Sequence, residues 1–254
     1  MNRLHQNSHP TIVFVHGAWA DSSCWNGVAA RLQADGYPVW AAPNTLRGIS
    51  SDAAYVASVL NAITGPIILV GHSYGGAVIS NAATGNPNIR ALVYIDALVP
   101  DQGESAFDIA GMPPPPGQST SCVAGDPSTL FNIVPYPGAQ NGDVDLYIKP
   151  EVYPTCFAND LQAKEAAVLA ASQRPITLSA LNEASGPPAW KDIPSWYLVG
   201  TLDNVIPPYA QLFMAQRANA QIVQVQASHP SMISAPKDVA ALVETAVQAV
   251  VATP

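Results

Sequence analysis

A serine flanked by glycines is the first feature of the sequence that points to chemistry. Residues 71–76 read GHSYGG and contain the pattern Gly-x-Ser-x-Gly, with Ser73 at its centre. The apolar run IILV precedes the pattern, and a small-residue stretch typical of a helix follows it. A serine on such a sharp strand-to-helix turn exposes its hydroxyl at the carboxyl end of a sheet. Glycines at positions 71 and 75 avoid clashes with the neighbouring strand and helix. The pattern therefore predicts Ser73 as a nucleophile.

A serine nucleophile needs a histidine base and an acid that orients it. His229 follows a late apolar run, and Asp203 follows the run WYLV. The resulting chain order of serine, aspartate and histidine is the one that this strand-turn-helix arrangement uses. Asp96 is the rival acid, because it ends the strand after the serine turn, but we expect it to cap a loop. We expect His72 to pack and to form hydrogen bonds rather than to act as the base.

Nucleophilic attack on a carbonyl also needs two backbone N–H donors for the developing oxyanion. We predict Tyr74, the residue after the nucleophile, and Ala18, in the early segment HGAW, as these donors. Gly17 allows this segment to approach closely. His16 is interpreted as a structural histidine that bonds to loop backbone. Trp19 either lines a pocket or packs beneath the loop.

The elements that position these residues alternate in type along the chain. Apolar, β-branched runs typical of buried parallel strands alternate with stretches that have helical spacing of apolar residues. Two of these helices are expected to be capped by residues 21–23 and 50–52. The alternation predicts an α/β fold with a doubly wound, mostly parallel sheet. The predicted strands are 11–15, 37–41, 67–70, 91–95, 196–199 and 222–225.

This rhythm is interrupted between residues 100 and 190, where prolines are dense and no strand-helix alternation is recognised. One helical piece is expected over 160–173. We interpret 100–190 as a cap inserted into a core formed by 1–99 and 191–254, because long excursions inside a compact fold are often lids or binding loops. About half of its apolar side chains are expected only to fix the cap to the sheet. The substrate-binding candidates are Trp19, Phe107, Phe131, Tyr153 and Phe157.

The amino-acid composition argues against some classes of binding partner. Of the 254 residues 48% are hydrophobic and only 11% are charged, which favours a large buried core. The net charge of -8 offers no basic field for phosphates, so nucleic acid is not an expected partner. No apolar run reaches the roughly 18 residues that a membrane span needs. Residues 1–10 are polar and lack an apolar signal core, so a cytoplasmic location is expected, with secretion after removal of a leader as the alternative.

The three cysteines are Cys24, Cys122 and Cys156, and none forms a CxxC pair. A zinc or thioredoxin-like site is therefore not expected. Cys122 and Cys156 fall in the same irregular region. They are either a disulfide or two unpaired thiols, and the sequence leaves both open.

The segments HGAW, GHSYGG, GTLDNVIP and SHPSMIS resemble those of the α/β-hydrolase superfamily. Within it they resemble the branch of plant methylesterases, hydroxynitrile lyases and bacterial pyrethroid hydrolase-like esterases. The resemblance covers residues 11–100 and 194–251 and implies a cap over the site and no metal or organic cofactor. Lyases of this branch carry a threonine where this chain has Gly17 and a lysine where it has Pro230. These departures favour esterase over lyase activity.

The leading hypothesis is hydrolysis of a neutral, fairly apolar small-molecule carboxylic ester through an acyl-enzyme. Alternatives are lyase-like chemistry, lactone or C–C bond hydrolysis and perhydrolysis on the same triad. A ligand-binding protein with a vestigial site is a further alternative, because fold does not dictate function. The oligomeric state is not predicted.

Overall fold

A six-stranded parallel sheet organises residues 9–251, the part of the chain that this computed structural model describes. The order is β2-β1-β3-β4-β8-β9. The chain runs outward from β1 to β2 and then returns to the other side of β1 with β3. The carboxyl ends of β1 and β3 thus meet where the winding reverses, the usual ligand position in such sheets. The strands are β1 (Thr11–Val15), β2 (Val39–Ala42), β3 (Ile67–His72), β4 (Ile89–Ile95), β8 (Ser195–Gly200) and β9 (Gln221–Val225).

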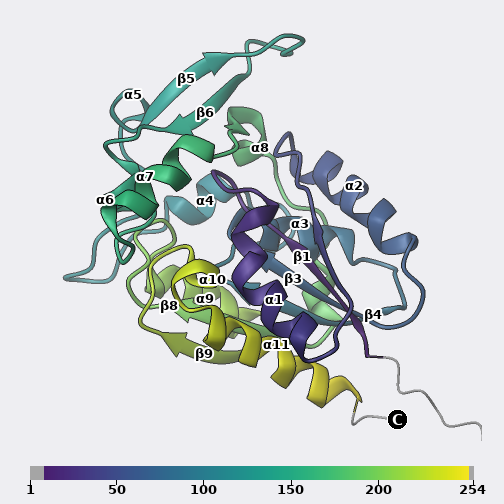
Figure 1. Cartoon of the computed structure of the whole chain (residues 1–254). Coiled ribbons are helices and arrows are strands. Elements are labelled where there is room, and N and C mark those ends of the chain that lie inside the picture. The colour runs from purple at the N-terminus through teal and green to yellow at the C-terminus, as the bar shows by residue number, and fades with distance from the viewer. Residues whose placement is uncertain (1–8, 252–254) are drawn as a thin grey trace, which may run out of the picture.

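Helices cover both faces of this sheet (Figure 1). Alternate residues of a strand point to opposite faces, so Ile12 and Phe14 of β1 belong to one core and Val13 and Val15 to the other. The first core is closed by η1 (Ser22–Trp25), α1 (Asn26–Ala34) and α11 (Pro236–Val251). The second is closed by α2 (Ile49–Asn61), α3 (Tyr74–Ala82) and α9 (Pro208–Arg217). The predicted α/β fold class is confirmed.

The start of α2 differs from the predicted cap at residues 50–52. The helix already begins at Ile49, and its N-cap residue, Gly48, has no side chain that could cap it. Asp52 lies in the first turn and is fully buried. Its carboxylate accepts hydrogen bonds from the N–H groups of Arg47 and Gly48, at 3.2 to 3.4 Å. Backbone donors before a helix need such partners, and here a residue inside the first turn supplies them.

Residues 100–190, here termed the cap segment, contain strands that the sequence did not reveal. A small antiparallel sheet orders its strands β5-β6-β7 (Figure 1). The sequence pattern did not reveal β5 because this strand ends on a proline and is mostly exposed, so it lacks a buried apolar run. Helix α7 confirms the helix expected over 160–173. The elements are α4 (Ala106–Ala110), α5 (Pro127–Leu130), β5 (Phe131–Pro135), β6 (Val144–Ile148), α6 (Tyr153–Cys156), α7 (Ala163–Ser172), β7 (Ile176–Thr177), α8 (Leu178–Asn182) and η2 (Ala189–Lys191).

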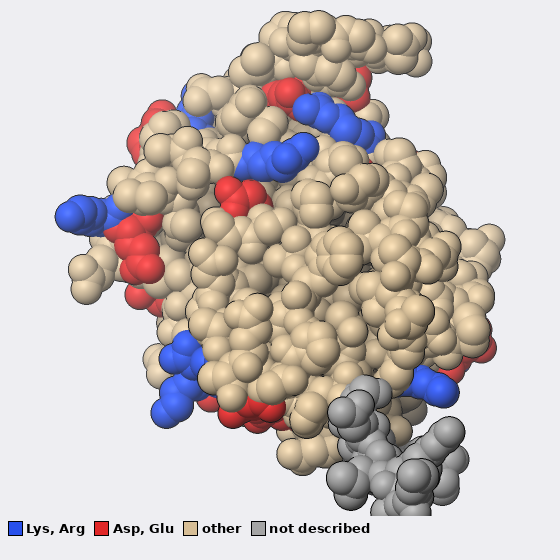
Figure 2. Space-filling view, turned by 45° about the vertical axis from the view of Figure 1, so that its right-hand side comes forward, with Lys and Arg blue, Asp and Glu red and all other residues tan. Residues whose placement is uncertain are grey.

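The disulfide that the sequence left open is present between Cys122 and Cys156, and Cys24 is buried with a free thiol. Residues 1–8, which form most of the polar N-terminal segment, and residues 252–254 lie outside the described part. Within the described part, no helix has the length and apolar character needed to cross a membrane. The space-filling view shows a broad uncharged area, with most charged side chains toward the edges of that face (Figure 2).

Candidate active site

Ser73 stands on a strained turn between β3 and α3. Its backbone has φ 52° and ψ −128°, a conformation that non-glycine residues rarely adopt and that concentrates at functional sites. Helix α3 can follow so sharply because Gly75 has no side chain. A Cβ atom at that position would lie 2.4 Å from the carbonyl oxygen of Val15 in β1. The glycine therefore lets the helix pack directly against the neighbouring strand.

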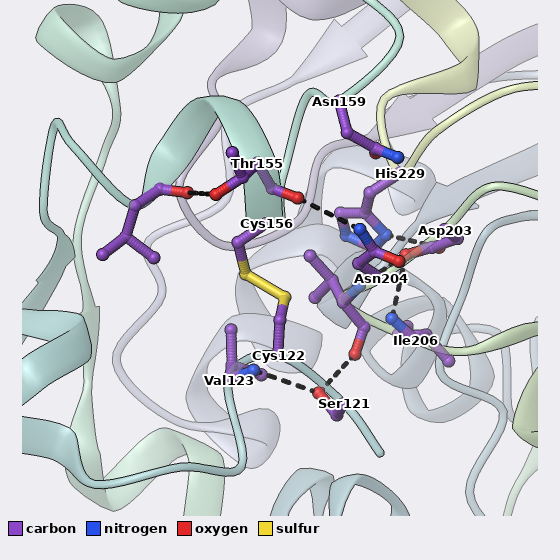
Figure 3. The surroundings of a disulfide bond; sticks show 12 residues. Ser121, Cys122, Val123, Thr155, Cys156, Asn159, Asp203, Asn204, Ile206 and His229 are labelled. Carbon is purple, nitrogen blue, oxygen red and sulfur yellow. Dashed lines mark hydrogen bonds and ion pairs between the residues drawn. A yellow bond between two sulfur atoms is a disulfide. The ribbon is translucent and has the colours of Figure 1, made fainter. Parts of the chain in front are cut away.

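Asp203 and His229 form a buried pair in the loops after β8 and β9. Nδ1 of His229 donates to Oδ2 of Asp203 at 2.7 Å (Figure 3), and both side chains are fully buried. Oδ1 of Asp203 accepts the N–H groups of Val205 and Ile206 at 2.7 and 2.9 Å. Because Nδ1 carries the proton, Nε2 of His229 has a free lone pair. Nε2 has no hydrogen-bond partner within residues 9–251.

Gln211, on α9, completes the surroundings of the acid. Its Nε2 donates to Oδ2 of Asp203 at 2.8 Å, and its side chain is buried. Sequence patterns do not single out Gln211, because a glutamine within an ordinary helical pattern carries no signal of its contacts. Asp203 thus accepts four N–H hydrogen bonds, which hold its two oxygens in fixed positions.

Burial sets the charge of the pair. Desolvation lowers the pKa of His229 to about 3, so the imidazole is neutral at pH 7 and able to accept a proton. Burial also raises the pKa of Asp203, and the N–H groups of Ile206 and Val205 oppose that rise. A carboxylate that accepts several N–H bonds is favoured in its charged form, which suits it to stabilise an imidazolium.

Asp96, the rival acid, forms its hydrogen bonds with backbone groups. Its Oδ1 accepts the N–H of Gly200 at 2.7 Å, and its Oδ2 accepts the N–H of Ser231 at 3.3 Å. Among the described residues it makes no hydrogen bond to His229. The carboxylate therefore ties the loops after β4 and β8 to α10 (Ser231–Ser234), as expected for a loop cap.

The side chain of His72 packs against the candidate base, His229. Its Nε2 donates to the backbone carbonyl of His229 at 3.0 Å, and the two rings lie 4.7 Å apart. A carbonyl can only accept, so the proton of His72 must sit on Nε2. Burial lowers the pKa of His72, which keeps it neutral. This confirms the expected packing and hydrogen-bonding role.

The segment HGAW lies directly against the nucleophile. A Cβ atom on Gly17 would lie 2.5 Å from Cβ of Ser73, so the absence of a side chain allows this close approach. Within residues 9–251 the N–H groups of Ala18 and Tyr74 donate no hydrogen bond. Both residues line the same cavity as Ser73. The two predicted oxyanion donors are thus free for a ligand beside the serine.

That cavity, of about 260 Å³, lies between the sheet and the cap segment. Trp19, Phe107 and Phe131 line it, as predicted, and Trp19 stacks on Phe131 at 5.5 Å. No charged side chain is among the described residues that line it. Apolar lining residues that the sequence did not single out come from β5, β6 and α8, namely Ile133, Val144, Leu146, Leu178 and Leu181.

Tyr153 and Phe157, predicted to bind substrate, do not line this cavity but border a separate small recess. The hydroxyl of Tyr153 donates to the carbonyl of Trp19 at 3.0 Å, and its ring stacks on Phe157. Phe157 presents its ring to His229 edge to face, with centroids 4.8 Å apart. Both aromatic side chains are almost fully buried, so they support the site rather than form its wall.

The disulfide lies beside the loop that carries Asp203 (Figure 3). Next to Cys122, the hydroxyl of Ser121 donates to the carbonyl of Val205 at 2.6 Å. The N–H of Cys122 donates to the carbonyl of Asn204 at 2.8 Å. Nδ2 of Asn204 in turn donates to the carbonyl of Thr155, which precedes Cys156, at 3.0 Å. The disulfide thus joins the loop at Cys122 to α6, the two cap elements that hydrogen-bond to the residues after Asp203.

Comparison with known proteins agrees with this architecture. Residues 12–242 match the alpha/beta hydrolase family. The chain belongs to this family. As an alpha/beta hydrolase, it is 34% identical over 152 residues to a carbendazim-hydrolysing esterase of Nocardioides sp. (strain SG-4G), covering 48% of this chain and 62% of that protein. It is 32% identical over 117 residues to a pyrethroid hydrolase of Sphingobium wenxiniae, covering 40% and 41%.

Solved structures share the fold of this alpha/beta hydrolase. An extracellular alpha/beta-hydrolase from a Paenibacillus species superimposes with a TM-score of 0.73 at 21% identity, covering 93% of this chain and 98% of the other. Polyneuridine aldehyde esterase superimposes with a TM-score of 0.77 at 19% identity, with the same coverages. The similarity thus extends through the cap segment, which the sequence motifs did not reach.

Proposed function

We propose that this hydrolase is a serine carboxylesterase with Ser73 as nucleophile, His229 as base and Asp203 as orienting acid. The observation that carries the proposal is the buried hydrogen bond between Asp203 and Nδ1 of His229. It leaves Nε2 unprotonated and without a partner within residues 9–251, while the nucleophile turn lies at the cavity. A neutral imidazole held in one tautomer by a carboxylate is the arrangement that activates a serine hydroxyl.

In this proposal the three residues act in two half-reactions. Oγ of Ser73 attacks the ester carbonyl while Nε2 of His229 takes the hydroxyl proton, and the oxyanion accepts the N–H groups of Ala18 and Tyr74. The imidazolium then protonates the leaving alcohol, which departs and leaves an acyl-enzyme. His229 next deprotonates a water molecule that attacks the acyl carbonyl, and the carboxylic acid is released as Ser73 regains its proton.

The cavity favours a neutral and apolar ester. Its described lining is almost entirely aliphatic and aromatic, and burial of an unpaired charge there would be costly. The relatives named for hydrolysis of carbendazim and pyrethroids are consistent with small neutral substrates. A second group of relatives is named as plant methylesterases.

A panel of substrates tests the proposal. We expect p-nitrophenyl acetate and butyrate to be hydrolysed, mandelonitrile to remain uncleaved, and Ser73→Ala to lose at least about 10⁴ in kcat. A fluorophosphonate should add one phosphonyl group to Ser73, detectable by peptide mass spectrometry. Cleavage of mandelonitrile with intact esters would instead establish a lyase, and a Ser73→Ala variant with a tenth of wild-type turnover would remove the nucleophile from the proposal.

The disulfide is relevant to the cellular compartment in which the protein acts. Disulfides persist in oxidising compartments and are rare in the cytosol of most organisms. We therefore propose an oxidising compartment instead of the cytoplasmic location that the polar N-terminal segment suggested. The test is to quench cells with acid and alkylate free thiols before extraction. Oxidised Cys122 and Cys156 would support this location, and full alkylation of both would overturn it.

A further inference from the structure

The first oxyanion donor is oriented through its own peptide bond. Nδ1 of His16 lies 2.9 Å from the carbonyl oxygen of Gly17, and Nε2 of His16 accepts the N–H of Asn44 at 2.9 Å. The carbonyl can only accept, so the proton must sit on Nδ1. The carbonyl of Gly17 and the N–H of Ala18 belong to one planar trans peptide and point in opposite directions. By holding the carbonyl, His16 aims the Ala18 N–H.

The second donor is held through its side chain. Tyr74 is the first residue of α3, and its hydroxyl donates to Oδ2 of Asp52 at 3.0 Å. Both side chains are almost fully buried. The carboxylate is itself fixed, because it also accepts the hydroxyl of Thr45 and the N–H groups of Arg47 and Gly48. Tyr74 is therefore anchored on both sides, by the nucleophile turn at its backbone and by Asp52 at its phenol.

Both anchors are tied to one segment, residues 44–52, which leads from β2 into α2: Asn44 binds His16, and Asp52 binds Tyr74. At its start Nδ2 of Asn44 also donates to the carbonyl of His16 at 3.0 Å. In its middle Nη1 of Arg47 pairs with Asp145 of β6 at 2.5 Å, and the carbonyl of Leu46 accepts the N–H of Thr177. The segment therefore contacts His16, which orients the Ala18 N–H, Tyr74, which carries the second donor, and the cap sheet.

We infer that His16 and Asp52 are positioning residues for the oxyanion hole, each fixing the residue or peptide that carries one donor, with segment 44–52 as their common support. The inference rests on the proposed function, because it assigns these residues to the transition state of that reaction. Preorganised donors act on the charge that develops in the transition state, and a misplaced donor lowers kcat more than it weakens substrate binding.

The neutral state of His16 fits this role. A protonated ring has two donors and could no longer accept the N–H of Asn44. Burial lowers the pKa of His16, which keeps the required tautomer at neutral pH. The groups that face the ring are the Gly17 carbonyl and the Asn44 N–H, with the charges of Arg174, Asp21 and Asp52 further away.

Small substitutions test the two anchors separately. Tyr74→Phe removes only the hydroxyl that Asp52 holds. His16→Ala removes both ring contacts, whereas His16→Asn keeps an amide nitrogen as far from the backbone as Nδ1. We expect Tyr74→Phe and His16→Ala each to lower kcat by about 10-fold or more, since loss of a whole oxyanion donor costs about 10²–10³. KM should change by less than about 3-fold. His16→Asn should recover most of the loss.

Two readouts separate positioning from general damage. Affinity for butylboronic acid, which forms a tetrahedral adduct on a nucleophilic serine, should fall in proportion to kcat/KM. The rate of fluorophosphonate labelling of Ser73 should fall likewise, and it reports even if no ester of the panel is hydrolysed. Tyr136→Phe is the matched control, because it removes only a hydroxyl that donates to Asp143 at 2.8 Å in the cap and keeps the ring that faces Arg47. It should keep wild-type kcat.

The outcomes are distinguishable. Wild-type kcat and labelling in both Tyr74→Phe and His16→Ala would overturn the inference and leave the proposed function intact. Equal losses in Tyr136→Phe would also overturn it, because the effect would then be general. A folded wild-type protein that neither hydrolyses esters nor is labelled at Ser73 would overturn the proposed function and the inference together.

Discussion

At the scale of single residues, two buried aspartates with different contacts give the sharpest contrast. We predict that Asp203→Asn lowers kcat by about 10⁴, because an amide can no longer fix the His229 tautomer or stabilise the imidazolium. Asp96→Asn should retain far more activity, since its carboxylate binds the N–H groups of Gly200 and Ser231. Steady-state kinetics on variants with matched circular dichroism would show this. A less active Asp96→Asn would transfer the acid role to Asp96.

The pH dependence of kcat/KM follows from the burial of His229. The base works in its neutral form, and burial lowers its pKa to about 3. The neutral fraction is therefore complete at pH 7 and is lost only as the pH falls through the lowered value. We expect kcat/KM for a non-ionising ester to stay level as the pH drops past about 6.5, the ordinary histidine value. Circular dichroism at each pH controls for unfolding. An acidic limb centred at or above that value would contradict this.

At the scale of elements, the disulfide supports both the cap and the loop of the acid. Replacing Cys122 and Cys156 by alanine should lower the free energy of unfolding by about 3–4 kcal/mol, from the loop of 34 residues that it closes. At temperatures well below the melting temperature, the double replacement should also lower kcat, because the carbonyls of Asn204 and Val205 lose a rigid partner. Thermal melts and kinetics with and without dithiothreitol would measure both effects.

Buried Cys24 provides the control for this experiment. A Cys24→Ala variant should respond to reductant as the wild type does, whereas the double variant should not respond. If the double variant kept wild-type kcat, the disulfide would stabilise the cap without helping to hold the acid.

A second prediction at this scale concerns the cap wall. Phe107→Ala and Phe131→Ala should change the ranking of short, long and aromatic esters by kcat/KM, because pocket contacts of methylene size are worth about 1–3 kcal/mol. The matched control is Val168→Ala, because Val168 is exposed on α7 and lies outside the cavity lining. This variant should leave the ranking of substrates unchanged. Uniform scaling of all substrates by both phenylalanine variants would assign specificity to the sheet loops instead.

The sheet could be predicted because several of its strands are short apolar runs, as in TIVFV of β1, IILV of β3 and WYLV of β8. The nucleophile turn was predictable because local backbone contacts require its glycines. The cap strands were not, because β5 is mostly exposed and pairs only with β6. Tyr153 and Phe157 were assigned to the pocket from their type alone, and type does not tell which side of a cap an aromatic ring faces.

At the scale of the whole molecule, charge should act on substrate choice in two ways. The net charge of -8 repels anions at a distance, and the apolar cavity penalises any charge inside it. We expect mono-p-nitrophenyl succinate to have a kcat/KM about 10²-fold or more below that of p-nitrophenyl butyrate. Raising the salt to about 0.5 M should recover only the long-range part. Equal rates for the two esters would reveal a cationic group at the site.

The close approach of Gly75 and Gly17 to neighbouring atoms has a consequence for laboratory evolution. At Gly75 any side chain overlaps the backbone of Val15 and His16, so randomised libraries should recover glycine alone there, and a side chain at Gly17 would have to displace Ser73. Much of the cavity wall, by contrast, is supplied by short cap elements such as β5 and α8. Selection for new substrates should therefore accumulate its changes at positions such as Ile133 and Leu178, while the turn stays invariant.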